Sequence, residues 1–303
     1  MRHSARQWSM STKPFVIVAC AAVLGVPRAA PAQQAPPTFA ATDTLPVDPN
    51  VRVGTLGNGL EYYVRENGRP ENRAELQLVV NAGSVLETED QRGLAHFVEH
   101  MAFNGTENFA KQELVAYLES IGMRFGADLN AYTSFDETVY MLTVPTDTGD
   151  FLERGILILE DWAHNQVFDP TEVEKERGVV IEEWRLGQGA AARMRDKMFP
   201  VLLKGSRYAE RLPIGEREVL ESFDPAELRA YYEAWYRPDQ MAVIAVGDFD
   251  ADEVERLIRE RFSRLEGEPV DRQLYPVPDH EQTLVSIVTD AEATNSSVTI
   301  YHK

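Results

Sequence analysis

Two histidines and a glutamate lie close together in one short stretch of this chain. His96, Glu99 and His100 form an H-x-x-E-H pattern inside the apolar segment GLAHFVEHM. On a helix, residues four apart in sequence lie about 40° apart around the axis, so the two imidazole rings share one face. Two such nitrogens can bind one zinc ion. Glu99 lies on the adjoining flank, where its carboxylate is placed to accept a proton from a water molecule bound to that ion.

The alternative to a metal site is a helix whose histidines simply lie in or near a core. The neighbouring side chains argue against this alternative, because Leu94, Phe97, Val98 and Met101 are apolar and predict that the helix is buried. A buried helix does not hold two histidines and a glutamate unless their polar atoms have partners. The pattern therefore favours a bound metal ion.

A catalytic zinc ion usually has three protein ligands and one open position. A carboxylate is the expected third ligand, since no cysteine follows Cys20. The predicted helix over 170–187 carries five candidates: Glu172, Glu174, Glu176, Glu182 and Glu183. Glu176 and Glu183 are seven residues apart and lie about 20° from alignment, so one could bind the metal while the other supports it. The two valines at 179 and 180 suggest that this side of the helix is buried.

Composition limits the class of protein and its partners. The chain has 303 residues, 44% of them hydrophobic and 26% charged, which is typical of a globular protein and not of a disordered or fibrous one. The net charge is −19, so the surface repels phosphate backbones and nucleic acid is not an expected partner. The single cysteine, Cys20, cannot form an internal disulfide.

Residues 1–32 are predicted to be a secretory signal peptide. They contain four basic residues and no acidic one, and they enclose an apolar run over 15–26 that is too short to span a bilayer. The small residues at 30–32 predict cleavage before Gln33. The alternative is lipoprotein processing at Cys20, because the residues before it resemble a lipobox. We expect an exported protein of a bacterial periplasm, whose mature chain has no membrane-spanning segment.

The rest of the chain is predicted to contain a leader, one folded domain and the start of another. Residues 33–50 hold four prolines among small and polar residues, so they are expected to be a flexible leader. The folded domain is expected over 51–266. Residues 267–303 are expected to be a linker and the start of a truncated second domain, with two strands within 283–303.

Hydrophobic periodicity predicts six strands and six helices in the folded domain. The strands are expected at 51–56, 60–65, 74–81 and 241–247, with two more within 127–144. The helices are expected at 93–103, 111–120, 150–165, 170–187, 224–235 and 251–262. The elements follow no βαβ rhythm, and Asn58-Gly59 favours a tight hairpin. We therefore predict an α+β fold, a mostly antiparallel sheet packed with helices on one side.

Three motifs make the chain similar to the insulinase/pitrilysin family of zinc metallopeptidases. They are GLAHFVEHMAFNG at 93–105, NAYT at 130–133 and ERGVVIEEWR at 176–185. The H-x-x-E-H order marks inverzincin peptidases, and the chain most resembles the bacterial periplasmic PqqL-type branch of the family. The similarity extends over about Val51 to Leu265 and implies a metallohydrolase fold like that of the mitochondrial processing peptidase, with 51–266 as the zinc peptidase domain.

The resemblance implies a role for each residue of the site. It implies the zinc ligands His96, His100 and Glu183, the general base Glu99 and the supporting carboxylate Glu176. Glu174 is the main rival for the third ligand. The reason is that Glu183 follows His100 by 83 residues, several more than is usual in the family. One zinc ion per domain is expected.

The resemblance also implies how substrate binds. The family adds a peptide as a strand to a sheet edge beside the metal, and Asn130, Ala131, Tyr132 and Thr133 match that edge. The alternative is an ordinary buried hairpin strand. The family is built from two related halves, and the second half supplies an arginine and a tyrosine that hold the peptide. Because the chain ends at Lys303, we expect it to need a second half-domain, in cis or in trans.

Together these observations predict a zinc-dependent metalloendopeptidase that hydrolyses peptides or small unfolded proteins. Glu99 is expected to take a proton from a zinc-bound water and deliver it to the leaving amine. One alternative is a metal-binding and peptide-binding subunit or fragment that is inactive until it is paired with a second half-domain. Another is a metallohydrolase on the same scaffold whose substrates are not peptides.

Overall fold

The computed structural model describes residues 47–302, apart from 112, 125 and 148. The expected signal peptide and its cleavage site, Cys20 and all but the last four residues of the expected leader lie outside the described residues. In the part of the chain that the structure describes, no helix is both long and apolar enough to cross a membrane.

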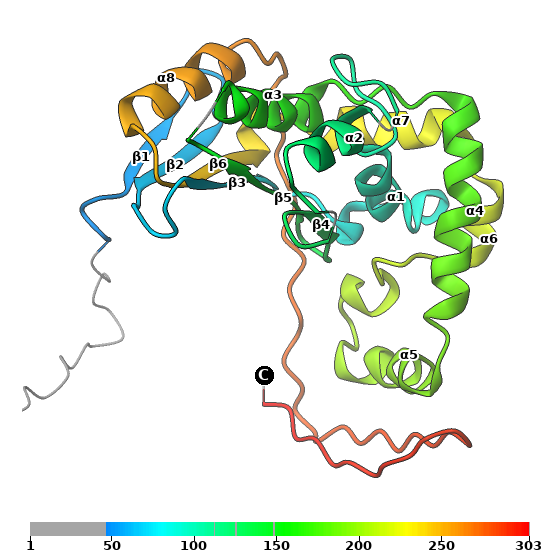
Figure 1. The fold of residues 1–303 in the computed structure, drawn as a ribbon. Helices are drawn as coiled ribbons and strands as arrows, with labels where there is room; N and C mark the ends of the chain where they lie inside the picture. The colour runs from blue at the N-terminus through cyan, green and yellow to red at the C-terminus, as the bar shows by residue number, and fades with distance from the viewer. Residues whose placement is uncertain (1–46, 112, 125, 148, 303) are drawn as a thin grey trace, which may run out of the picture. The chain divides into compact units, whose positions relative to one another are not determined.

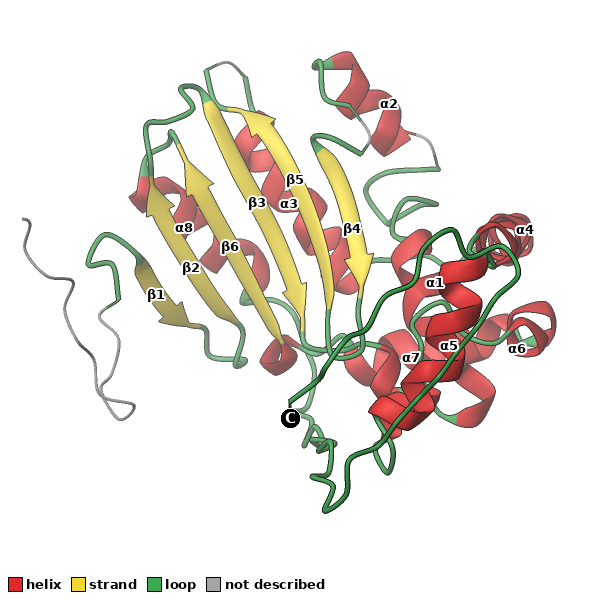
Figure 2. Cartoon of the chain, turned by 90° about the horizontal axis from the view of Figure 1, so that it is seen from below, coloured by secondary structure: helices red, strands yellow, loops and turns green. Residues whose placement is uncertain are grey.

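Six strands form a single sheet with the order β1-β2-β6-β3-β5-β4 (Figure 2). The strands are β1 (Arg52–Thr55), β2 (Glu61–Glu66), β3 (Arg73–Val80), β4 (Leu129–Thr133), β5 (Thr138–Pro145) and β6 (Met241–Gly247). All neighbouring pairs are antiparallel except β2 and β6, which are parallel. The predicted antiparallel sheet is therefore confirmed, with one parallel pair between strands far apart in the sequence.

Helices cover the apolar face of this sheet. Ala74, Leu76, Leu78 and Val80 of β3 are fully buried, whereas Glu75 between them is exposed. Two helices lie over the buried face, α3 (Phe151–His164) on β3 and β5, and α8 (Ala251–Phe262) on β2 (Figure 1). The close approach of α3 requires a glycine, because a Cβ atom at Gly155 would lie 2.6 Å from Leu76 Cδ1.

The remaining helices lie beyond the β4 edge and carry the candidate site (Figure 1). They are α1 (Leu94–Met101), α2 (Glu113–Ser120), α4 (Pro170–Leu186), α5 (Ala190–Leu202), α6 (Arg217–Ser222) and α7 (Pro225–Trp235). All six predicted helices form, each within about two residues of its expected ends. The sequence did not predict α5, which buries no residue, or α6, which has six residues and buries only Leu220.

The two strands expected within 283–303 are not observed, since residues 283–302 contain no strand. Apolar side chains of this segment are open to solvent, with Ile287 88% exposed and Ile300 90% exposed. A strand forms only when its backbone pairs with a neighbouring edge, and this segment has no such neighbour among the described residues.

A buried carboxyl group from a preceding turn caps the helix α1. Gly93, at the N-cap, has a φ of 106° and no side chain to satisfy the first N–H groups of the helix. Glu87 supplies the acceptor instead, because its Oε1 accepts a hydrogen bond from the Ala95 N–H at 2.8 Å. Its other oxygen, Oε2, is buried with no partner among the described residues. Burial raises the pKa of Glu87 to about 8, although the Ala95 and Gly93 N–H groups oppose the shift.

This raised pKa predicts a pH-dependent stability. An unfolded glutamate ionises near 4.5, so between pH 4.5 and about 8 the folded chain keeps a proton that the unfolded chain loses. The contribution of this retained proton to the free energy of unfolding is fully present below pH 4.5. It decreases as the pH rises and is lost above about pH 8. The total loss is at most about 5 kcal/mol. Urea unfolding of wild type and Glu87→Gln tests this. We expect wild type to lose stability relative to the variant between pH 5 and 8, whereas parallel pH profiles would contradict the assignment.

Candidate metal centre

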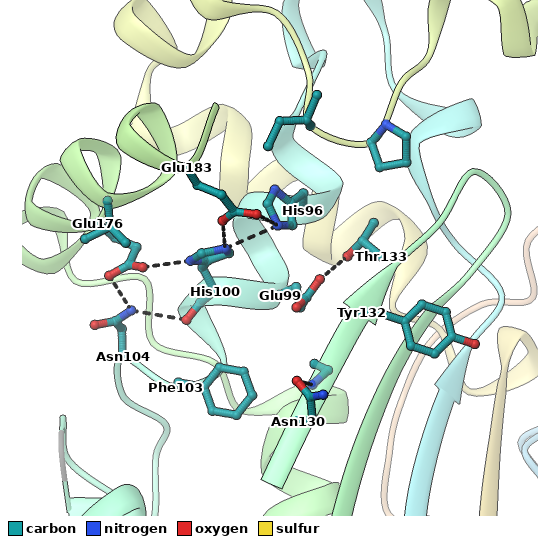
Figure 3. A pocket seen from close by; sticks show the side chains of 14 residues that line it. His96, Glu99, His100, Phe103, Asn104, Asn130, Tyr132, Thr133, Glu176 and Glu183 are labelled. Carbon is teal, nitrogen blue, oxygen red and sulfur yellow. Dashed lines mark hydrogen bonds and ion pairs between the residues drawn. The ribbon is translucent and has the colours of Figure 1, made fainter. Parts of the chain in front are cut away.

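Two helices that cross beside the sheet carry the candidate ligands. α1 is anchored by Phe97 and Val98, both fully buried, so His96 and His100 face away from that core toward α4 (Figure 3). α4 begins at Pro170, and Asp169 caps it: the Asp169 side chain accepts hydrogen bonds from the N–H groups of Thr171 and Glu172. α4 is long enough to bring its last turns, with Glu183, next to α1 (Figure 3).

The three side chains converge on one point. The Nε2 atoms of His96 and His100 are 3.2 Å apart. Glu183 Oε2 lies 3.3 Å from Nε2 of His100, and Glu183 Oε1 lies 3.7 Å from Nε2 of His96. Ligands of a tetrahedral zinc ion with bonds of about 2.0–2.1 Å lie about 3.3–3.4 Å apart. The spacing and the chemistry of this donor set therefore fit a single small divalent cation.

A second carboxylate orients one of the rings. Nδ1 of His100 donates a hydrogen bond to Glu176 Oε1 at 2.8 Å, which holds the ring so that Nε2 faces the other two side chains. The Asn104 side chain donates to Glu176 Oε2 at 2.9 Å and to the His100 carbonyl oxygen at 3.1 Å (Figure 3). Asn104 lies within the motif at 93–105, but its supporting role was not predicted, because no spacing rule marks an amide as a support for a ligand.

Burial and hydrogen bonding set the charges of the cluster. Burial and the charge of the neighbouring His100 together lower the pKa of His96 to about 4, although Glu183 opposes the shift. Burial also opposes the charged form of His100, but the hydrogen bonds to Glu176 and Glu183 outweigh it and raise the pKa of His100 to about 9. The pKa of Glu183 is lowered, first of all by its hydrogen bond with His100. His96 is thus neutral and Glu183 ionised near pH 7, the forms in which these groups bind a cation. His100 is protonated near pH 7 in the metal-free chain and must release one proton before its Nε2 atom can bind a cation.

Replacing the supporting carboxylate should weaken metal binding without removing a ligand. We expect Glu176→Gln to lower zinc affinity about 10- to 100-fold, because the amide no longer provides a charged acceptor for the His100 ring. Competition with a fluorescent zinc chelator measures the change. The control is Glu182→Gln, since Glu182 lies on the same helix, half exposed and paired with Arg185. Equal affinities for the two variants would contradict the supporting role.

Glu99 lies beside the candidate metal ligands His96, His100 and Glu183 but is not one of them. The residue is almost buried, with 9% of its surface exposed, and its Oε2 accepts a hydrogen bond from Thr133 Oγ1 at 2.6 Å. Burial raises the pKa of Glu99, and the Thr133 hydrogen bond opposes that shift. A carboxylate with a raised pKa next to a metal site can both accept and return a proton.

Apart from Glu183, the glutamates of α4 do not belong to the set of candidate metal ligands. Glu174, the rival third ligand, is ion-paired with Arg177 at 2.8 Å and its side chain is 59% exposed. One expectation for this helix is wrong. Val180 is fully buried, but Val179 is 52% exposed and lines the pocket at the metal site. Consecutive helix residues point about 100° apart, so a narrow buried stripe accommodates only one of them.

The three candidate metal ligands line a pocket of about 620 Å³, and residues of the strand β4 line its other side. β4 is the last strand of the sheet, so one of its edges is unpaired. The Ser134 N–H donates a hydrogen bond to the Glu137 carbonyl oxygen at 2.7 Å, which shows which opposite residues of β4 and β5 form hydrogen-bonded pairs. Because hydrogen-bonded and non-hydrogen-bonded pairs alternate, the backbone groups of Ala131 and Thr133 point toward the free edge. The Ala131 N–H contacts the Asn130 side-chain oxygen at 3.0 Å.

Comparison with known proteins shows the family of this chain. The sequence profile described as "Insulinase (Peptidase family M16)" matches residues 62–198. A protein of Arabidopsis thaliana named "Zinc protease PQQL-like" is 46% identical over 253 residues, which cover 82% of this chain and 26% of that protein. The chain belongs to the insulinase family. A further profile of the family, "Peptidase M16 inactive domain", matches residues 222–302.

Other members of the insulinase family have the same fold. The "Probable zinc protease PqqL" of Escherichia coli (strain K12) is 36% identical over 260 residues, which cover 86% of this chain and 28% of that protein. The crystal structure of the first half of the periplasmic protease PqqL from Escherichia coli superposes with a TM-score of 0.74 at 38% identity. The match covers 78% of this chain and 51% of that one. The chain spans about a quarter of the full length of these relatives.

Proposed function

We propose that the chain is the zinc-binding catalytic part of a metalloendopeptidase that hydrolyses peptides or small unfolded proteins. The observation that carries the proposal is the shared pocket: three metal donors, a nearly buried carboxylate beside them and an unpaired strand edge all line it. His96, His100 and Glu183 would hold the zinc ion. Family membership and relatives named as zinc proteases support this assignment.

The residues of the chain then have distinct tasks. When bound, zinc polarises a peptide carbonyl and lowers the pKa of water toward neutrality. Glu99 accepts a proton from the attacking water and delivers it to the leaving amine. Glu176 holds the ring of His100 through Nδ1, so this ligand keeps its orientation when metal enters or leaves.

The strand β4 would receive the peptide. A substrate that adds as a strand to this edge pairs with the outward backbone groups of Ala131 and Thr133 and lies along the pocket beside the metal donors. Backbone pairing holds a peptide with little dependence on its sequence, which suits a peptidase for unfolded chains. To reach the Ala131 N–H, a peptide would have to displace the Asn130 side chain.

Ala131→Pro separates strand addition from metal binding. The ladder with β5 does not use the Ala131 N–H, so proline at this position removes only a free-edge donor. We expect kcat/KM for a peptide to fall about tenfold, the effect of one lost hydrogen bond, with zinc content unchanged. Ala131→Ser, which keeps the N–H, serves as the control. Unchanged turnover by Ala131→Pro would be evidence that the peptide binds elsewhere.

The proposed activity is tested with a set of unstructured fluorogenic peptides, assayed before and after removal of zinc by a chelator. We expect cleavage that stops on chelation and returns with added zinc. The same assay with the separately produced remainder of a PqqL-type protease tests the alternative, because the curated relatives are about four times longer than the matched region. Cleavage only in the mixture would favour a subunit or fragment that needs its second half. Turnover of small esters but not of peptides would favour another metallohydrolase.

We also propose that the protein acts outside the cytoplasm. A basic N-terminal segment with a short apolar run precedes the folded domain, and the PqqL protease of Escherichia coli is described as periplasmic. Residues 1–32 would then be removed after export. N-terminal sequencing of the exported protein tests this, with Gln33 as the expected first residue and Met1 as the contradicting result.

A further inference from the structure

The carboxylate of Glu99 is held from the strand that faces the pocket. Thr133, the last residue of β4, donates its hydroxyl proton to Glu99 Oε2 at 2.6 Å (Figure 3). This length is that of a charge-assisted hydrogen bond between a hydroxyl group and a carboxylate. Among the described residues, Thr133 is the one hydrogen-bond partner of the Glu99 side chain, so Oε1 has no protein donor.

A neighbouring threonine does not compete for Glu99. The hydroxyl of Thr138 on β5 lies 3.5 Å from the hydroxyl of Thr133 and donates its proton to the Ala82 carbonyl oxygen at 3.0 Å. A threonine hydroxyl has a single proton, so each of the two hydroxyls has a separate acceptor. The hydroxyl of Thr133 therefore donates its proton to Glu99, and the hydroxyl of Thr138 does not compete for the same carboxylate.

We propose that Thr133 is the positioning residue for the general base. Its hydroxyl fixes one carboxylate oxygen of Glu99 and leaves the other oxygen to accept the proton. A glutamate side chain has three rotatable bonds, and restricting them before the reaction lowers the entropic cost of reaching the reactive geometry. Because Thr133 also presents its backbone to the free edge of β4, one residue links the proposed peptide strand to the base. The inference rests on the proposed function.

Thr133→Val tests the proposal, since valine keeps the shape of the side chain and removes the hydroxyl. The variant is assayed under the condition in which wild type cleaves peptide, either alone or in the mixture. We expect kcat to fall about tenfold or more, with KM changed by no more than about twofold. Zinc content should not change, because Thr133 contacts none of the three donors. Thr133→Ser restores the hydroxyl and should recover kcat to within about threefold of wild type.

Thr143 provides a matched control. It is also a strand threonine whose hydroxyl donates to a glutamate, Glu75, at 2.8 Å, but that pair is exposed and lies outside the pocket. Thr143→Val should leave kcat unchanged. A readout independent of activity is urea unfolding of the metal-free chain. Thr133→Val should lower the midpoint more in wild type than in a Glu99→Ala background, whereas Thr143→Val should shift both backgrounds equally.

The outcomes separate this inference from the proposed function. If wild type cleaves peptide and Thr133→Val stays within about threefold of it, or if Thr133→Ser is as slow as Thr133→Val, the positioning role is overturned. If wild type cleaves no peptide, alone or with the remainder of a PqqL-type protease, the proposed function fails. In that case equal unfolding shifts of Thr133→Val in the two backgrounds would also overturn the link between Thr133 and Glu99.

Discussion

Glu99→Gln is expected to reduce peptide turnover by about three orders of magnitude while zinc stays bound. The carboxylate lies next to the three donors but is not one of them, so the substitution removes the proton acceptor and leaves the ligand set intact. General acid–base catalysis contributes about 10²- to 10⁴-fold to enzymatic rates, and glutamine cannot carry the proton. Glutamine still offers an oxygen to the Thr133 hydroxyl, so folding should be preserved.

Zinc content and steady-state kinetics of the purified variant measure this effect. The fall should appear in kcat, because Glu99 acts on the reacting water and not on peptide binding. Glu182→Gln is the matched control, an exposed glutamate paired with Arg185. A Glu99→Gln variant that keeps more than about a tenth of wild-type kcat would rule out Glu99 as the general base.

Glu183→Gln should have a comparably large effect on the metal itself. A structural zinc ion binds with about 10–16 kcal/mol shared among four ligands, so losing one ligand should weaken binding about 100-fold or more. The variant keeps the shape of the side chain, and Glu183 is half exposed, so stability should change little. Equilibrium competition with a chelator of known affinity measures the loss.

Glu174→Gln is the control that decides between the two candidate third ligands. Glu174 is paired with Arg177 and lies outside the donor group, so its substitution should leave zinc affinity unchanged. If Glu174→Gln lost zinc while Glu183→Gln kept it, the assignment of the third ligand would be reversed.

The sequence predicted those parts of the site that depend on local periodicity. His96, Glu99 and His100 lie within five residues, so one helix fixes their relative directions and the structure only adds their surroundings. Glu176 and Glu183 share a helix face for the same reason. Periodicity alone left open which of them binds the metal. In the structure, Glu183 faces both Nε2 atoms and Glu176 contacts Nδ1 of His100.

Contacts between distant segments could not be predicted in this way. The capping of α1 by Glu87, the support from Asn104 and the hydrogen bond between Thr133 and Glu99 each depend on tertiary packing. The strands β2 and β6, which pair in parallel, are separated in the sequence by most of the domain, so no local sequence pattern could predict their pairing. α5 was missed because it buries none of its residues and so has no apolar stripe to reveal it.

The opposite error arose at 283–303. We predicted two strands there, but a strand also needs an edge to pair with, and the sequence does not show whether such an edge exists. Periodicity thus reports the preference of a segment, while its structure depends on available partners.

The central claim is that two imidazoles of α1 and one carboxylate of α4 hold a single zinc ion. X-ray absorption spectroscopy of the zinc-loaded chain tests it most directly, because the fine structure reports the number and type of atoms bound to the metal. We expect one zinc ion per chain, with two imidazole nitrogens at about 2.0–2.1 Å and the remaining ligands oxygen. Substoichiometric zinc, or a spectrum with fewer than two imidazoles, would contradict the account.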